Sequence, residues 1–140
     1  MPYRKADIRP YRDSDEPLLF GLARTAFGDR PGWSDRRTLS VLERDTVFVA
    51  EVDADPAGYV ALDPRERRVQ IDQLLISPQH EGEGVGRQLV EYAEGYAIWR
   101  GARAVSVVVE GDNRRAVAFY RRYGFAPAAF DLLELVLPQP

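Results

Sequence analysis

Three glycines that alternate with larger residues stand between an apolar run and a helical pattern in the middle of the chain. Gly82, Gly84 and Gly86 allow positive φ angles there, and they place no Cβ between the backbone amides and an approaching ligand. A helix is expected to begin at this point. Loop amides followed by a helix N-terminus form a concave site of partial positive charge. The stretch from Val69 to Leu89 therefore predicts a site for a phosphate or a pyrophosphate.

The spacing of these glycines excludes two common phosphate loops. A P-loop needs Lys followed by Ser or Thr after its last glycine, whereas Arg87 and Gln88 follow Gly86 here. The dinucleotide fingerprint, counted from Gly82 and Gly84, needs a third glycine at the position of Arg87. The pattern that fits is Q/R-x-x-G-x-G/A, the pyrophosphate loop of the GCN5-related N-acetyltransferases. The chain resembles this superfamily (GNAT).

Two acidic residues depart from the family pattern in this loop. Glu81 stands where the family carries Gln or Arg, and Glu83 stands where Lys or Arg is frequent. A carboxylate about 8 Å from a pyrophosphate charge costs roughly 2 kcal/mol at an effective dielectric constant of about 20. Since the family contact runs mostly through backbone amides, both side chains are expected to point to water. The resemblance implies acetyl-coenzyme A (acetyl-CoA) as co-substrate, bound by Leu75, Ile76, Glu81, Gly82, Glu83, Gly84, Val85, Gly86 and Arg87.

A second stretch resembles the same family. Residues 113–125, N-R-R-A-V-A-F-Y-R-R-Y-G-F, are similar to the family block N-x-x-A-x-x-F/L-Y-x-x-x-G-F. The resemblance implies that Asn113 hydrogen-bonds the pantetheine arm of coenzyme A and that Ala116 and Tyr120 also contact it. Asn113 equally suits the N-cap of a helix, and the two roles are compatible. Nearby arginines are candidates for the 3′-phosphate, namely Arg114, Arg115, Arg121 and Arg122.

Tyr120 matches the family tyrosine that donates a proton or a hydrogen bond to the departing coenzyme A sulfur. From the residues alone, it is equally a core aromatic on an apolar helical stripe. A free thiol has a pKa of about 8.5 and tyrosine one of about 10, so complete proton transfer from the tyrosine is slightly uphill. Hydrogen bonding is therefore expected to account for much of any effect.

Asp72 is the candidate base. A lysine-like amine has a pKa of about 10.4, so only about one molecule in 2,500 is neutral at pH 7, and a base or a water relay assists its attack on a thioester. The run I-D-Q-L-L around Asp72 also resembles the corresponding strand of aminoglycoside 6′-N-acetyltransferases, which carry an aspartate there. The alternative is a carboxylate at the cleft edge that only binds the acceptor cation. Glu110 and Asp112 are secondary candidates.

Composition narrows the classes of function. The formal net charge is −3, with 19 Lys and Arg against 22 Asp and Glu, so no basic field exists for nucleic acid or an anionic membrane. A cationic acceptor is the milder implication. The absence of cysteine excludes disulfides, thiolate metal sites and a cysteine acyl-enzyme, so acyl transfer must be direct or use another nucleophile.

Further features concern metals, membranes and location. The single histidine, His80, is expected at the surface, and no His, Asp or Glu cluster has the spacing of metal ligands. The first residues are charged, and no apolar run approaches the length of a bilayer span. These features predict a cytoplasmic protein without a bound metal. A homodimer is left open.

The elements that position these residues form one domain, 1–140, of mixed α/β type. We expect strands over 6–11, 46–52, 58–62, 69–76, 105–109 and 132–137, and helices over 17–27, 34–42, 85–100 and 114–123. This predicts a GNAT-like fold with a mixed sheet of six or seven strands and about four helices. The first turn of the hairpin is expected at 55–58, and the loop that contains Trp33 is the first place to look for acceptor contacts.

The central strand contains a break in its pattern. Val69 and Ile71 share one phase of the alternation, whereas Leu74 and Ile76 fall on the other phase. A slip of one residue predicts a β-bulge. A strand buried on both faces explains the apolar run at 74–76 equally well. In the resembled family this strand is bulged and diverges from its parallel neighbour, which leaves a cleft for the pantetheine arm.

The resemblance implies an N-acetyltransferase that passes an acetyl group directly from acetyl-CoA to a primary amine of a small molecule, a protein or a peptide. The alternative keeps the fold without the turnover. In that case the chain is an acyl-CoA-binding sensor or interaction module, in which Glu81 and Glu83 have weakened catalysis or ligand affinity.

Overall fold

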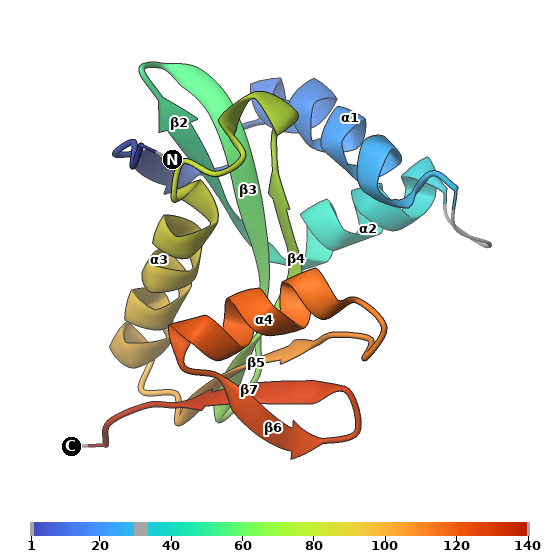
Figure 1. Cartoon of the computed structure of the whole chain (residues 1–140). Helices are drawn as coiled ribbons and strands as arrows, with labels where there is room; N and C mark the ends of the chain where they lie inside the picture. Colours follow the sequence, from blue (N-terminus) through green and yellow to red (C-terminus); the bar gives the residue numbers. More distant parts are fainter. Residues whose placement is uncertain (1, 30–33, 140) are drawn as a thin grey trace.

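A mixed sheet forms the centre of the computed structural model, which describes residues 2–29 and 34–139. Within these residues, seven strands follow the order β1-β2-β3-β4-β5-β7-β6 (Figure 1). Their bounds are β1 Asp7–Pro10, β2 Thr46–Val52, β3 Asp55–Pro64, β4 Arg68–Ile76, β5 Ala104–Val108, β6 Ala126–Ala129 and β7 Leu132–Val136. All neighbours pair antiparallel except β4 and β5, which are parallel. The predicted mixed sheet is confirmed.

Helices cover both faces of the sheet. The four α-helices of the described residues are α1 Glu16–Phe27, α2 Asp35–Arg44, α3 Val85–Trp99 and α4 Arg114–Tyr123. The larger hydrophobic cluster joins α3 and α4 to one face, with Leu89 and Val105 fully buried in it. The smaller cluster lies under α1 and α2 on the other face, around Leu19 and Tyr59. The two faces of the sheet therefore contact different helices and different buried side chains.

The predicted bulge lies in β4. Ala61 of β3 pairs with Gln73, and Leu62 pairs with Ile71, so Asp72 is the extra residue. Because of this insertion, Leu74 packs in the cluster beneath α3 and α4, as Ile71 does. The slip in the sequence pattern is confirmed as a bulge, and Asp72 is placed on the face that α2 covers, beside Arg44.

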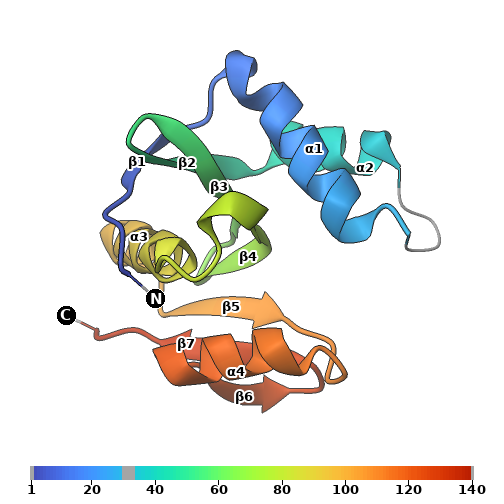
Figure 2. The same cartoon turned by 45° about the horizontal axis from the view of Figure 1, so that its top comes forward.

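The strands β4 and β5 are paired over only part of their length. Their register runs from Arg68 with Ala104 to Ile71 with Val107, although β4 continues to Ile76. Figure 2 shows the parting between the half with β1 to β4 and the half with β5 to β7 and α4. Beyond Ile71, the edge of β4 that faces β5 has no strand partner, so alternate backbone amides there are available to a ligand.

Two sequence expectations about the strands were wrong. The first turn of the hairpin lies at Asp53 and Ala54, which have φ angles of 51° and 65°, and not at 55–58. Two successive residues at positive φ give a turn whose twist matches that of the flanking strands. The strand β6 was not expected, because its residues Ala126–Ala129 are all exposed and carry neither an apolar alternation nor a β-branched side chain.

His80 ties three segments together at the start of the glycine loop. Its Nε2 lies 2.6 Å from Asp55 Oδ2 at the start of β3, and its Nδ1 lies 2.6 Å from Glu83 Oε1. Glu83 also accepts a backbone hydrogen bond from Arg4 at 2.9 Å. His80, which was expected at the surface, is partly exposed: its side chain is 12% exposed and lies between the carboxylates of Asp55 and Glu83.

This arrangement predicts a pH-dependent contribution to stability. Hydrogen bonds from Asp55 and Glu83 raise the pKa of His80 above its ordinary value. The stabilisation is therefore fully present below about pH 6.5, the pKa in the unfolded chain, and is lost as the pH rises through the folded-state pKa. We expect His80→Gln to lower the free energy of unfolding by at most about 1 kcal/mol near pH 6, and by less at pH 9.

Denaturant unfolding of the wild-type chain and of His80→Gln between pH 5.5 and pH 9 measures the difference in their free energies of unfolding. Asp55→Asn is the matched variant, because it removes one of the two carboxylates and leaves the imidazole in place. A difference between wild type and His80→Gln that stays constant or grows toward alkaline pH would contradict the interpretation.

Candidate active site

The glycine loop leads directly into α3. Gly82 and Gly84 have φ angles of 76° and 81°, as predicted, and Gly84 is the N-cap residue of the helix. A Cβ on Gly84 would approach Tyr3 Cδ2 to 2.9 Å, so the N-terminal segment also requires a glycine here. Gly86 lies inside the first turn of α3, as the helix predicted over 85–100 requires, and it does not have a positive φ angle. Because Gly86 has no side chain, it leaves space in the cavity that it lines.

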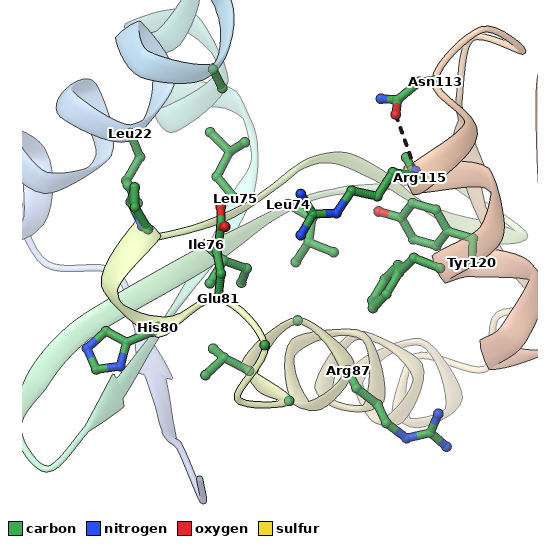
Figure 3. Close-up of a pocket in the computed structure, with 18 of the residues that line it drawn as sticks. Leu22, Leu74, Leu75, Ile76, His80, Glu81, Arg87, Asn113, Arg115 and Tyr120 are labelled. Atoms are coloured by element: carbon green, nitrogen blue, oxygen red, sulfur yellow. Dashed lines mark hydrogen bonds between the residues drawn. The ribbon is translucent and has the colours of Figure 1, made fainter. Parts of the chain in front are cut away.

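This cavity has a volume of about 680 Å³ and opens between the glycine loop, the end of β4, and α4 (Figure 3). It is lined by most of the residues predicted to contact the co-substrate, namely Leu75, Ile76, Glu81, Gly82, Gly84, Val85, Gly86, Arg87, Asn113, Ala116 and Tyr120. Glu83 is not among them, and it does not point to water as expected, because it is bound by His80 with a side chain 16% exposed. Glu81 does line the cavity and brings a negative charge to it.

Arginines supply positive charge at the same cavity. Arg115 and Arg122 line it, whereas the other two candidates, Arg114 and Arg121, do not. Figure 3 shows Arg115 reaching into the space between α4 and β4. Arg87 also lines the cavity, but its guanidinium lies 5.1 Å from the centre of the Tyr123 ring and its Nε lies 3.3 Å from Glu91 Oε1. Arg115 and Arg122 are therefore the cations best placed to meet a phosphate.

Tyr120 projects from α4 toward β4 and lies where two cavities meet. It is 6% exposed and packs edge-on against Phe119 and Phe125, with ring centroids 5.0 and 5.2 Å away. Burial raises the pKa of its hydroxyl above the ordinary value, so the group stays protonated and can donate a hydrogen bond. The core and the functional interpretations of this residue are compatible, since the ring packs while the hydroxyl borders the cavities.

Asn113 caps α4. Its side-chain oxygen accepts a hydrogen bond from the Ala116 backbone amide at 3.2 Å. Asn113 also lines both cavities. Because the cap uses the amide oxygen, the side-chain NH₂ group is the part that could bind a carbonyl of a ligand.

A second cavity, of about 970 Å³, also borders Tyr120 and is acidic. Asp72, Glu110 and Asp112 line it, and none of its lining residues is Lys or Arg. Asp72 is held in place by Gln70 Nε2 at 3.0 Å and by an Arg44 Nη2 at 3.2 Å. The three carboxylates proposed from the sequence thus line one cavity, and their negative charge suits a cation.

Two parts of the acceptor side were not available to sequence reasoning. Trp33, the first residue to examine for acceptor contacts, lies outside the described residues. Asp45, which was not singled out, contacts Asp72 through Arg44. No local pattern marks Asp45, because the bulge in β4 and the end of α2 bring it to Asp72 from 27 positions away in the chain.

The described residues contain no group of three or more His, Cys, Asp or Glu side chains that could hold a metal ion. None of the described helices has the length and hydropathy needed to cross a membrane.

Comparison with known proteins gives consistent results. A sequence profile described as the acetyltransferase (GNAT) family matches residues 9–125. The chain is 37% identical over 90 residues to an uncharacterized N-acetyltransferase of Methanocaldococcus jannaschii, covering 59% of this chain and 40% of that protein. It is 40% identical over 128 residues to the mycothiol acetyltransferase of Beutenbergia cavernae, covering 84% of this chain and 43% of that protein. The chain thus spans about two fifths of the length of both relatives.

Solved structures share the fold. The ribosomal-protein-S18-alanine N-acetyltransferase of Escherichia coli has a TM-score of 0.82 at 20% identity, covering 97% of this chain and 96% of that chain. A GNAT family acetyltransferase of Brucella melitensis in complex with acetyl-CoA has a TM-score of 0.72 at 20% identity, covering 98% of this chain and 94% of that chain. The profile match includes the bulged strand, the glycine loop and the helix of Tyr120, and the chain belongs to the GNAT acetyltransferase family.

Proposed function

We propose that this chain is an N-acetyltransferase that passes an acetyl group directly from acetyl-CoA to a primary amine of a small molecule, a protein or a peptide. The observation that carries the proposal is the meeting of two unlike cavities at Tyr120. One adjoins the glycine loop and the N-terminus of α3, and three arginines are in its lining. The other is lined by three carboxylates. An anionic co-substrate would suit the first cavity and a cationic acceptor the second, with Tyr120 on the border of both.

The co-substrate side offers complementary groups for each part of acetyl-CoA. Amides of the loop and the first turn of α3 suit the pyrophosphate, and Arg115 and Arg122 suit a further phosphate. The parting between β4 and β5 beyond Ile71 suits the extended pantetheine arm. A backbone amide near Leu75 or Ile76 is the proposed donor to the thioester carbonyl, where negative charge develops during attack.

The reaction requires two proton movements. The ammonium of the acceptor gives one proton to Asp72, and the freed lone pair attacks the thioester carbon. When the C–S bond breaks, Tyr120 donates a hydrogen bond to the departing sulfur, and the second proton lost from nitrogen neutralises the thiolate. Since burial raises the pKa of Tyr120, we assign it the role of a hydrogen-bond donor rather than a full proton donor.

One observation favours a second candidate, an acyl-CoA-binding sensor or interaction module with little or no turnover. Glu81 lines the cavity proposed for the co-substrate and opposes its negative charge. Release of free thiol from acetyl-CoA, measured over polyamines, aminoglycosides, amino acids and N-terminal peptides, separates the two candidates. Turnover with an amine supports the enzyme, whereas binding of acetyl-CoA without thiol release over the whole panel supports the sensor.

Two glycines of α3 provide a test of the co-substrate site. A Cβ on Gly86 would make ordinary contacts with Phe119 at 3.5 Å, and a Cβ on Gly95 would meet nothing within 4 Å, so both alanine variants should fold. We expect Gly86→Ala to weaken acetyl-CoA binding about tenfold, because a methyl group then stands between the backbone and the pyrophosphate. Gly95→Ala should bind normally.

Thermal melting with acetyl-CoA, coenzyme A and NADH measures this difference, since a ligand at 100 times its dissociation constant adds about 2.7 kcal/mol of stability. Equal stabilisation of the two variants would place the pyrophosphate elsewhere. The absence of a shift with either coenzyme A species would contradict the proposed co-substrate.

Two tyrosines of α4 provide a test of the leaving-group role. Tyr120→Phe keeps the packed ring and removes only the hydroxyl, so acetyl-CoA binding should stay nearly intact while kcat falls by roughly 10² to 10⁴. Tyr123→Phe is the control, because the Tyr123 hydroxyl donates to Glu94 Oε1 at 2.6 Å, away from both cavities. Steady-state kinetics of both variants with a reactive amine is the measurement. An unchanged kcat in Tyr120→Phe would remove the proposed role.

Asp72 is tested by the division of its effect between kcat and KM. If it is the base, Asp72→Asn should lower kcat and abolish the acidic limb of the pH profile. Asp63→Asn is the control, because that carboxylate pairs with Arg65 outside both cavities. An increase in the acceptor KM alone would identify Asp72 as a cation anchor instead.

A further inference from the structure

The end of α2 places a buried carboxyl group beside Asp72. Asp45 is the C-cap residue of α2, and its backbone amide donates to Val41 at 2.8 Å, which fixes its position. Its side chain is fully buried. Within the described residues, Asp45 Oδ2 has no hydrogen-bond partner, whereas Oδ1 accepts from Arg44 Nε at 3.1 Å. A buried carboxylate oxygen without a donor is unfavourable, and the neutral acid costs less to bury than the charged form.

One guanidinium connects this carboxyl group to that of Asp72. Arg44 donates from Nε to Asp45 and from Nη2 to Asp72 at 3.2 Å. Asp72 receives a second donor, Gln70 Nε2, and its side chain is 14% exposed on the wall of the acidic cavity. Two carboxyl groups therefore share one positive charge, and a single additional proton makes the three groups neutral.

The surroundings of the two carboxyl groups decide which one holds that proton. The pKa of Asp45 is raised to about 7, first by burial and then by the neighbouring Asp72, against the opposing effect of Arg44, which lowers it. Arg44 of α2 and Asp72 of β4 are the charged groups that act on it, and Glu110 and Asp112 lie on the cavity beyond Asp72. Asp72, with two donors and access to the cavity, is suited to carry the charge, and buried Asp45 is suited to hold the proton.

We infer that Asp45 is a positioning residue that acts through Asp72, so that the two carboxyl groups take up a single proton in the neutral pH range. The inference rests on the proposed acetyl transfer and deepens it. The acceptor N–H bond breaks, the proton passes to the Asp72 carboxylate and is held by the pair, and it leaves to water after the product. The pair thereby accepts a proton at neutral pH, where an isolated carboxylate accepts it poorly.

Titration of the free 140-residue chain tests the inference without turnover. Carboxyl ¹³C resonances of labelled aspartate, followed from pH 4 to pH 9, should show Asp45 titrating near pH 7. Asp72→Asn should move the Asp45 transition to lower pH, and Arg44→Gln should move it to higher pH, each by about one pH unit. Asp63→Asn should leave it in place. A merely structural role would not move the transition in opposite directions.

The pH dependence of acetylation gives the second readout. Asp45→Asn should remove the titration near pH 7 and shift the acidic limb of the kcat/KM profile by at least about one pH unit. Binding of acetyl-CoA should stay unchanged. If Asp45→Asn does not fold, Arg44→Gln, which should shift the limb in the opposite direction, answers the same question.

The outcomes distinguish this inference from the proposed function. If the aspartate titration near pH 7 responds to these substitutions but the chain acetylates no amine, the result would support the paired protonation and contradict the acetyltransferase. Turnover without any aspartate transition between pH 6 and pH 8, or with an acidic limb indifferent to Asp45 and Arg44, would overturn the inference alone.

Discussion

One extra residue in the central strand shapes the rest of the molecule. Asp72 has no partner on β3, so the alternation of side chains along β4 slips by one residue at this point. The pairing of β4 with β5 ends at Ile71. A regular strand would continue the pairing and close the sheet. The bulge instead leaves backbone amides of β4 unpaired on one edge, and it directs the carboxylate of Asp72 to the face under α2. A cleft and a charge are therefore produced by the same insertion.

The two cavities differ in charge. Near the glycine loop, the N-terminus of α3 and arginines line the first cavity, which favours negative charge. In the second cavity, which residues of α1, β4, β5 and the start of α4 line, carboxylates collect without a cation in the lining. Tyr120 belongs to the core cluster of α3 and α4 and borders both cavities. Its position requires α4 to begin where Asn113 caps it, so a local hydrogen bond fixes the geometry between the two cavities.

Much of this arrangement could be predicted from local patterns. The phase slip between Ile71 and Leu74 predicted the bulge, and the glycine spacing predicted the loop, because both features are written in neighbouring residues. His80, Asp45 and β6 were missed for a common reason. Their environments depend on contacts between segments far apart in the chain, and nothing in the flanking residues marks them. The hairpin turn was misplaced because Pro56 and Gly58 are strong turn formers, although the positive φ angles fall at Asp53 and Ala54.

The acidic lining of the second cavity has a consequence for the end of the catalytic cycle. In the proposed reaction, Asp72, Glu110 and Asp112 would attract the ammonium group of the acceptor through its charge. Acetylation would convert that ammonium into a neutral amide, which these carboxylates no longer attract. The attraction that draws the acceptor in would therefore disappear with the chemical step itself. Product inhibition by the acetylated amine is expected to be weak. Release of coenzyme A would limit the exchange of product for fresh substrate, because the transfer leaves its negative charges unchanged.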